Sequence, residues 1–339
     1  MSQNRRRRFN GSDFFRNIFQ KIVFICVEKS LADGRLFFTD STHIKANASR
    51  KTEYIKQTEE VTNEYLKELD QYEETIRSHL ESEGKIKPAR CRKRKEKTET
   101  VHRRVGSTDP ESGFYKRKGK AEGMHYLSHE TVDSKNGIII NVAATAGNVH
   151  DSQPYIKRLD YIEETIGLKI QTACADSGYD TNLIHQQLSE RNIDFYTPKR
   201  PGSKRGTAEF QRKDFQYDEE QVEFIYPGGK ELPLNRLNRT TNTVTKEYRC
   251  PKAVCKDCPL RSRCIGEKGA EKRIQVNIFE ETVQKNHKKD GTETHTRVLL
   301  LRQIWSEGCF AAQKARPNFF FGIFSYLLKL PTLKMGFAP

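Results

Sequence analysis

Residues 35–43 read Arg-Leu-Phe-Phe-Thr-Asp-Ser-Thr-His, an apolar run that leads directly into an acid and two hydroxyl residues. A short run with aromatic residues, bounded by Gly34 and by polar residues, is typical of a buried strand. Asp40 then stands at the expected end of this strand, where a half-buried carboxylate is costly unless it meets a cation or a metal ion. The same Asp-Ser-Thr sequence also suits a helix N-cap or a turn, so this stretch alone leaves both interpretations open.

A second predicted strand, over 168–175, also runs into an acid, Asp176. A helix over 181–190 and a short strand over 193–197 follow, and this alternation predicts an α/β layer. Functional groups gather at the carboxyl ends of strands in such sheets. Two adjacent carboxylates repel each other unless a cation lies between them, and Mg²⁺ binds one or two carboxylates together with phosphate oxygens and water. Two such ions, about 3.5–4 Å apart, support phosphodiester chemistry. We therefore expect Asp40 and Asp176 to converge on divalent metal.

A third acid is expected from the last helical region, about 294–314. Glu307, in Gln303-Ile-Trp-Ser-Glu-Gly-Cys-Phe310, is the candidate, and Lys314 follows two turns later along the same side. Taken by itself, Lys314 is interpreted as a solvated side chain. Asp151 is the rival second acid, but its place before a predicted helix with Pro154 early in it favours capping. His150 is interpreted as a structural or polar-contact residue, and Tyr179 as either a packing or a DNA-contacting residue.

Hydrophobic spacing predicts the remaining elements. We expect an amphipathic helix over 12–30, a long helix with an apolar stripe from Val61 to Leu80, a β-hairpin over 123–145 and a second hairpin around 222–230. The first hairpin turns at Asn136-Gly137, a strong turn signal. Residues 199–250 are otherwise polar and rich in turns.

The composition favours a polyanionic partner. The 339-residue chain carries 60 Lys and Arg against 45 Asp and Glu, a net charge of +15, and nucleic acid is the first such partner to consider. The longest apolar run, 319–328, is too short to cross a bilayer, and the N-terminus shows no secretion signal. A basic run from Lys85 to Arg104 is either a solvated, flexible loop or a contact to the phosphate backbone, through Arg92, Lys93 and Arg94 above all.

Four of the eight cysteines are clustered as Cys250-x4-Cys255-x2-Cys258-x5-Cys264. Four thiolates at such spacing can hold a tetrahedral Zn²⁺ ion, and free thiols are the alternative. Neighbouring basic residues are expected to lower the pKa values of these thiols and to suit phosphate contact; they are Lys252, Lys256, Arg261 and Arg263. The isolated cysteines are interpreted as packing residues; they are Cys26, Cys91, Cys174 and Cys309.

Five motifs, in this order, resemble those of bacterial insertion-sequence DDE transposases. The first-aspartate motif is Phe38-Thr-Asp-Ser-Thr-His-Ile-Lys-Ala-Asn-Ala48, and the second-aspartate motif is Ala175-Asp-Ser-Gly-Tyr179. The glutamate motif is Trp305-Ser-Glu-Gly-Cys-Phe310 through Lys314. Thr108–Gly113 and Gly147–Ser152 resemble the intervening motifs. The resemblance covers about residues 5–316. It implies an RNase H-like α/β fold in which Asp40, Asp176 and Glu307 bind two Mg²⁺ (or Mn²⁺) ions.

The same resemblance implies the activity and the partners. In the family pattern Lys314 is a DNA phosphate contact, with a solvated side chain as the alternative, and Arg302 is a further expected DNA contact. That family cuts the ends of its element by water attack and joins the freed 3′-hydroxyl to target DNA. We therefore expect a cytoplasmic, nucleoid-associated bacterial enzyme that acts on double-stranded DNA as a homodimer. A cysteine-rich knuckle is common in related transposases at the position of Cys250–Cys264, usually with a further cysteine near the position of Tyr226.

Three features depart from the family pattern. The arginine common four residues before the glutamate is Gln303 here, with Arg302 beside it. The chain begins beyond most of the usual N-terminal DNA-end-binding domain, and Asn318–Pro339 is an atypical tail. An inactive, truncated transposase that only binds DNA is therefore the alternative function.

The expected organisation has five parts. Residues 1–34 are interpreted as the remnant of a helical N-terminal region, 35–198 as the RNase H-like core with a helical and basic insertion at about 50–107, 199–270 as the cysteine-rich insertion, 271–316 as the catalytic helix region and 317–339 as the tail.

Overall fold

The computed structural model describes residues 12–48, 53–60, 64–88, 99–117, 119, 122–200, 209–218, 220–226, 228–240, 243–265 and 269–315. The predicted DNA contacts Arg92, Lys93 and Arg94, the isolated Cys91 and the tail 317–339 lie outside these residues. The chain divides into two compact units, one formed by 1–61, 98–200 and 282–339 and the other by 62–97 and 201–281.

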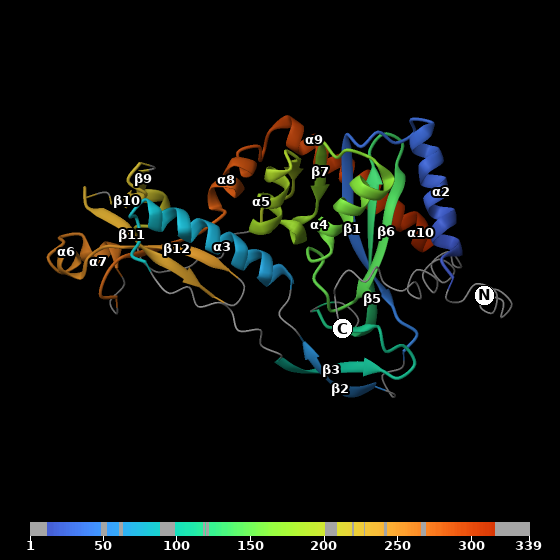
Figure 1. Cartoon of the computed structure of the whole chain (residues 1–339), viewed down its shortest axis with the longest axis horizontal. Helices are drawn as coiled ribbons and strands as arrows, with labels where there is room; N and C mark the ends of the chain where they lie inside the picture. Colours follow the sequence, from blue (N-terminus) through green and yellow to red (C-terminus); the bar gives the residue numbers. More distant parts are fainter. Residues whose placement is uncertain are drawn as a thin grey trace. The chain divides into compact units, whose positions relative to one another are not determined.

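The first unit is built on a mixed six-stranded sheet, with neighbouring strands in the order β4-β5-β1-β7-β8 and β6 paired to β5. Strands β1, β5, β6 and β7 are labelled in Figure 1. Strands β1, β5 and β6 are antiparallel, whereas β7 and β8 run parallel to β1. This mixed α/β layer is consistent with the expected RNase H-like fold. The strands are β1 (Leu36–Lys45), β4 (Gly113–Tyr115), β5 (Gly123–Asp133), β6 (Ile138–Ala146), β7 (Thr172–Ala175) and β8 (Asp194–Tyr196).

Alternating side chains of β1 enter two different cores, as the pleat of a strand requires. Phe37 is fully buried in the larger core, which also takes side chains from α2, α4 and α5. Phe38 is fully buried in a smaller core with Cys174 and Val298. The helices are α2 (Phe14–Glu28), α4 (Tyr155–Tyr161) with the π-helical turn η2 (Ile162–Ile166), α5 (Asn182–Glu190), α8 (Glu280–His287), α9 (Glu293–Arg302), the π-helical turn η5 (Gln303–Glu307) and α10 (Gly308–Ala315).

The smaller core fixes the C-terminal helices against the sheet. Helix α9 begins at Thr292, whose hydroxyl accepts a hydrogen bond from the His295 amide, a normal N-cap. Trp305, the only tryptophan of the chain, packs with this core. The ring of Trp305 covers Gly137 so closely that a β-carbon there would lie 2.2 Å from it. The predicted turn at Asn136-Gly137 is confirmed, and its glycine also makes room for the tryptophan.

The first unit also holds a two-stranded sheet that the sequence pattern did not predict. Strand β2 (Glu53–Glu60) pairs with β3 (Glu99–Gly106) in antiparallel register. Of the two interpretations of the basic run Lys85 to Arg104, the solvated loop is therefore wrong for residues 99–104, which belong to β3, and the phosphate contact stays a prediction. The Arg104 guanidinium lies 4.8 Å from the centre of the Phe114 ring, a cation–π contact.

The second unit holds a five-stranded antiparallel sheet in the order β13-β12-β11-β10-β9. The long predicted helix is confirmed as α3 (Glu64–Ser82), and its buried Glu73 pairs with Arg77 and Arg239. The predicted second hairpin is confirmed as β10 and β11. The elements are β9 (Gln216–Asp218), β10 (Glu223–Ile225), β11 (Glu231–Arg239), β12 (Val244–Arg249) and β13 (Arg273–Asn277), with α6 (Lys252–Lys256), α7 (Arg261–Cys264) and the 3₁₀ turn η4 (Arg212–Asp214).

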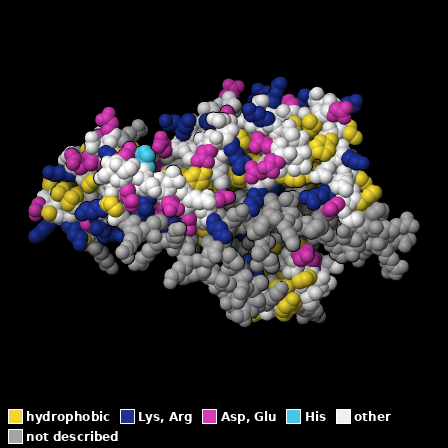
Figure 2. Space-filling view, in the orientation of Figure 1, with side chains coloured by type: hydrophobic (Ala, Val, Ile, Leu, Met, Phe, Trp, Pro, Cys, Tyr) yellow, Lys and Arg dark blue, Asp and Glu magenta, His cyan; other side chains and the backbone are white. Residues whose placement is uncertain are grey.

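The surface carries charges of both signs. Figure 2 shows basic and acidic side chains interspersed over the described part of the face in view. Within the described residues, no helix has the length and apolarity needed to cross a membrane.

Candidate active site

Asp40 lies in the middle of β1 and not at its end, which corrects the predicted strand boundary. Strand β1 continues to Lys45 because β5 remains paired with it up to the Lys45–His125 position. The parallel neighbour β7, however, pairs with β1 only as far as Thr39 and Ala175. Asp40 is therefore the first β1 residue beyond the carboxyl end of β7, at the edge where functional groups gather.

Asp176 follows Ala175 directly and is brought beside Asp40 by the same register. Adjacent strands lie about 4.8 Å apart, so the two acids occupy neighbouring positions at one edge of the sheet. Asp176 caps the 3₁₀ turn η3 (Ser177–Tyr179), and its Oδ1 accepts a 2.7 Å hydrogen bond from the Gly178 amide. This bond orients the carboxylate.

Glu307 reaches the same place from the end of η5. The Arg302 guanidinium joins it to Asp40, with Nη1 3.0 Å from Asp40 Oδ2 and Nη2 3.1 Å from Glu307 Oε1. Residues five apart lie about 140° apart around an α-helix. In a π-helical turn the backbone hydrogen bonds run from residue i to residue i+5, and this wider turn brings Arg302 and Glu307 to one side. Arg302 stands five residues before Glu307, one more than in the family pattern, and it still contacts the glutamate.

The electrostatics of Asp40 reflect this convergence. Burial, with smaller repulsions from Asp176 and Glu307, raises the pKa of Asp40 to about 6, against the lowering by the Ser41 amide and the Arg302 charge. The Asp40 side chain is 15% exposed and that of Glu307 is 57% exposed. The three predicted acids are therefore close enough to affect one another, and Arg302 pairs with two of them.

Glu130 is a fourth acid that the sequence pattern missed. It stands opposite Asp40 on β5, so the two side chains leave the same face of the sheet. Burial, together with the Asp40 charge, raises the pKa of Glu130 to about 7, although Gln313 and Arg158 lower it. Gln313 donates a 3.0 Å hydrogen bond to its Oε2. No clear signal in the sequence singles out Glu130, because the burial of β5 over nearly its whole length is visible only in the fold.

Asp151 does not cap a helix, which makes the predicted capping role wrong. Helix α4 begins at Tyr155 with Pro154 as its N-cap, three residues further along. A β-carbon on Gly178 would lie 2.8 Å from Asp176 Oδ1 and 3.5 Å from Asp151 Oδ2, so the two carboxylates flank one glycine. Asp151 is thus a neighbour of the second acid.

The other predicted residues lie as follows. His150 is exposed and its Nδ1 lies 2.7 Å from the Ser152 hydroxyl, a local polar contact as predicted. Tyr179 is fully buried beside Tyr155, which makes it a packing residue. Lys314 is on α10. The Arg302 side chain is 11% exposed, and its expected DNA contact stays a prediction.

The four clustered cysteines line one small cavity of the second unit, of about 20 Å³. Tyr226 lines it too, with its hydroxyl 3.5 Å from Cys258 Sγ. Without a metal ion, burial and the neighbouring Cys255 thiol raise the pKa of Cys250 to about 12. Burial also raises the pKa of Cys264, although Lys272 lowers it. The expectation of lowered thiol pKa values is therefore wrong for these two cysteines, because burial and mutual repulsion outweigh the nearby cations.

Comparison with known proteins gives one family. A family model described as transposase DDE domain matches residues 32–288 and so includes Asp40 and Asp176 but ends before Glu307. Searches of curated proteins and of solved structures give no match. The match covers more than half of the 339 residues, and the chain therefore belongs to the family of transposase DDE domains.

Proposed function

We propose that the protein is a DNA transposase that cuts the ends of its element and joins them to target DNA, with Asp40, Asp176 and Glu307 as its metal ligands. The observation that carries the proposal is the convergence of three acids from distant parts of the chain. Register places Asp40 beside Asp176, and one guanidinium joins Asp40 to Glu307.

The residues present fit Mg²⁺ or Mn²⁺. Carboxylate oxygens are the hard ligands that these ions take in proteins. The raised pKa of Asp40 means that its ionised form is poorly stabilised by the protein alone. A divalent cation among the acids would relieve both the burial cost and the mutual repulsion. When bound, such ions polarise the scissile phosphate and activate the attacking hydroxyl.

The chain itself supplies orientation and charge balance. The Gly178 amide holds Asp176, and the Ser41 amide donates a 2.8 Å hydrogen bond to Asp40 Oδ1. Arg302 balances Asp40 and Glu307 while they carry no metal ion, and its fork geometry suits two acids at once. We assign Arg302 a positioning role for both acids. Double-stranded DNA as the substrate and a homodimer as the active form complete the proposal.

We further propose that Cys250, Cys255, Cys258 and Cys264 hold a structural Zn²⁺ ion. All four line the same cavity, and four thiolates are a common closed zinc site. The ion would deprotonate thiols that are otherwise held neutral by burial. It would also link α6 and α7 to the end of β12, so its expected effect is on folding of the second unit.

The test is cleavage of a DNA fragment that holds the coding sequence with several hundred base pairs of its native flanks. The full chain with Mg²⁺ or Mn²⁺ is expected to cut at defined positions in the flanks, and chelation should stop it. Asp40→Asn, Asp176→Asn and Glu307→Gln should each lower the rate by at least about a thousandfold, the scale seen when a group essential to charge stabilisation is removed.

Two further variants sharpen this test. Asp160→Asn is the control and should cut normally. Asp160 lies on α4, is partly exposed and pairs with Arg191, away from the three acids. Asp151→Asn decides between the neighbouring acids, since loss of cleavage there with retention in Asp176→Asn would transfer the second-acid role to Asp151. Cleavage that persists in all three proposed ligand variants would refute the metal-site assignment.

A further inference from the structure

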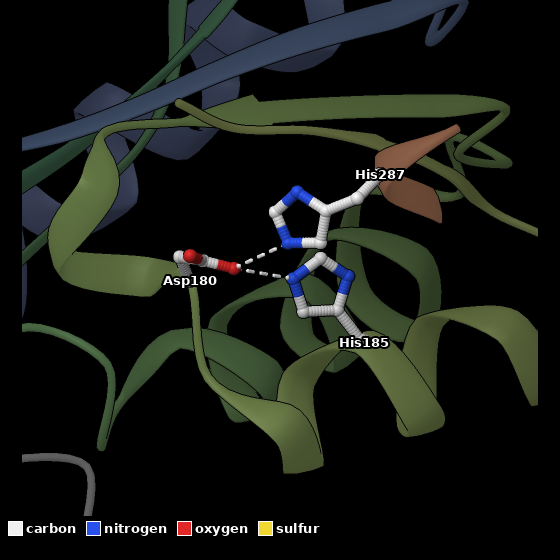
Figure 3. A group of neighbouring side chains, drawn as sticks. All are labelled: Asp180, His185 and His287. Carbon is white, nitrogen blue, oxygen red and sulfur yellow. Dashed lines mark hydrogen bonds and ion pairs between the residues drawn. The ribbon is translucent and has the colours of Figure 1, made fainter. Parts of the chain in front are cut away.

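A cluster of one aspartate and two histidines lies in the first unit, apart from the three acids. Figure 3 shows the two imidazoles facing one oxygen of Asp180. Asp180 Oδ1 is 2.8 Å from His185 Nε2 and 3.2 Å from His287 Nε2. One ligand atom from each of the three residues lies within 4.8 Å of the others. The side chains are nearly buried, at 9%, 1% and 9% exposure for Asp180, His185 and His287.

The atoms that face away from the centre of this cluster all have partners. Asp180 Oδ2 accepts a 2.9 Å hydrogen bond from the Arg200 amide. His287 Nδ1 lies 2.8 Å from Asp290 Oδ2, and His185 Nδ1 lies 3.0 Å from Asn286 Nδ2. Turning the Asn286 amide over would present its oxygen to Nδ1–H of a metal-bound His185. Metal-binding histidines characteristically hydrogen-bond through the other ring nitrogen, most often to a carboxylate or a carbonyl oxygen. Here the outer contacts leave two Nε2 atoms and one carboxylate oxygen turned toward a common point.

The surroundings of His287 suit a metal ligand. Its ring lies between two carboxylates, Asp290 at Nδ1 and Asp180 at Nε2. A divalent ion bound to Nε2 would leave Nδ1–H to donate to Asp290 alone, the arrangement usual for a metal-bound histidine. With Asp180 and Asp290, such an ion also gives the cluster a neutral formal charge.

We propose that Asp180, His185 and His287 bind a late first-row divalent ion, with Zn²⁺ as the probe and water as a further ligand. Two imidazoles and a carboxylate are suitable ligands for Zn²⁺ at about 2.0–2.2 Å. Tetrahedral ligands at that distance lie roughly 3.3–3.6 Å apart, so shifts of about half an ångström open the cluster to the ion. Mg²⁺ prefers carboxylate, carbonyl and water oxygens, so the two imidazoles disfavour it.

The ion would tie together segments that serve the three acids. Asp180 is four residues beyond Asp176, and His185 is on α5. His287 ends α8, just before the helix that carries Arg302. Thr282 also donates a 2.6 Å hydrogen bond to Gln186 Oε1, so α8 already lies on α5. The bound ion would therefore hold the C-terminal helices in register with the strand edge, as a structural clamp.

The experiment measures zinc in the full chain, first stripped with a chelator and then titrated with Zn²⁺ and separately with Co²⁺. The wild type should bind one ion whose Co²⁺ spectrum lacks the near-ultraviolet thiolate-to-metal band, in addition to any ion held by the cysteines. His185→Asn and His287→Asn should each lose that one ion per chain. Asp290→Asn should weaken its binding by about 10–100-fold, the usual effect of removing an outer partner.

His295→Asn is the matched control. His295 is also buried and lies 3.4 Å from Asp290 Oδ1, but it is outside the proposed ligand set. This variant should keep the ion. Equal zinc content in the wild type and in folded His185→Asn would overturn the proposal. X-ray absorption of the zinc-loaded wild type decides the matter even if a variant fails to fold: imidazole and oxygen neighbours support the site, whereas sulfur neighbours alone, or no bound ion, overturn it.

Discussion

Replacing Asp40 by asparagine is expected to stabilise the metal-free protein at neutral pH while removing a proposed metal ligand. Burial first, and then repulsion from Asp176 and Glu307, raises the pKa of this carboxyl from 3.8 to about 6. The opposing effects of Ser41 and Arg302 are already contained in that value. Each pKa unit corresponds to about 1.4 kcal/mol, so ionised Asp40 costs the folded state about 3 kcal/mol. The side chain is only 15% exposed, so solvent screening removes little of this.

The sign of the effect follows from proton linkage. Because the folded-state pKa is raised, the folded protein favours the neutral carboxyl, and this stability is fully present below about pH 4. It is lost as the pH rises through about 6. Asparagine resembles the neutral acid at every pH, and its amide oxygen can still accept the Arg302 hydrogen bond. The stability difference between the variant and the wild type should therefore grow from near zero at pH 4 to about 3 kcal/mol at pH 7.5.

The assay is urea unfolding in the presence of a chelator, followed by the fluorescence of Trp305. This tryptophan is the only one in the chain and belongs to the core beneath the site, so it reports the first unit. Glu307→Gln is the control, because its side chain is 57% exposed and little change is expected. Adding Mg²⁺ should stabilise the wild type and not Asp40→Asn. A wild type that is more stable than Asp40→Asn in chelator at pH 7.5, or a difference that does not change with pH, would refute this reasoning.

Three further outcomes are expected. Gly137→Ala should lower the free energy of unfolding by about 2–3 kcal/mol in the same urea assay, because a β-carbon there would meet the Trp305 ring and the residue has a positive φ. Gly167→Ala, also at positive φ but with open space around it, should cost about 1 kcal/mol. Equal losses in the two variants would contradict the contact with Trp305. Arg302→Lys should lower the DNA cleavage rate at least about tenfold, since one ammonium cannot replace a fork shared by two acids, and the exposed Arg297→Lys should cut normally. Zinc bound to the cysteines should transfer to a metal-binding dye more readily at pH 5 than at pH 8, because protons compete for thiols whose pKa values are raised; transfer that does not change with pH would contradict thiolate ligation.

Local sequence patterns predicted the parts of the fold that local chemistry controls. The apolar runs before Asp40 and Asp176 gave two central strands, and Asn136-Gly137 gave the hairpin turn. Pairing between strands was not visible in either run. Asp40 lies inside its strand only because β5 continues beside it, and its position at a functional edge depends on where β7 stops.

Elements that depend on distant partners were missed for the same reason. Strand β3 is rich in charge, and its pairing with β2 crosses the sequence occupied by α3. Two described strands of the second unit, β9 and β10, have three residues each, too short to show periodicity. His185 and His287 give no spacing signal either, because α5 and α8 bring them together only in the folded chain.

The π-helical turn at Gln303–Glu307 leads to a last prediction, which concerns deletions. A π-turn absorbs one residue more than a regular α-helical turn. Ile304 lies in this turn and is 61% exposed. Deleting it should convert the turn to α-helix, leave the flanking helices in register and keep Arg302 facing the glutamate at an i, i+4 spacing. Cleavage should then remain within about tenfold of the wild type, a loss of about 1.4 kcal/mol or less in the barrier.

Deleting Leu300 is the matched comparison. Leu300 is also exposed, at 55%, but it lies inside regular α9. Its removal rotates one side of the helix by about 100° relative to the other, so Val298 can no longer pack under the sheet while Arg302 reaches Asp40. Loss of cleavage in this variant, with retention after deletion of Ile304, would attribute the unusual arginine spacing to the extra residue. Equal loss in both would mean that the π-turn is itself required, and the compensation argument would fail.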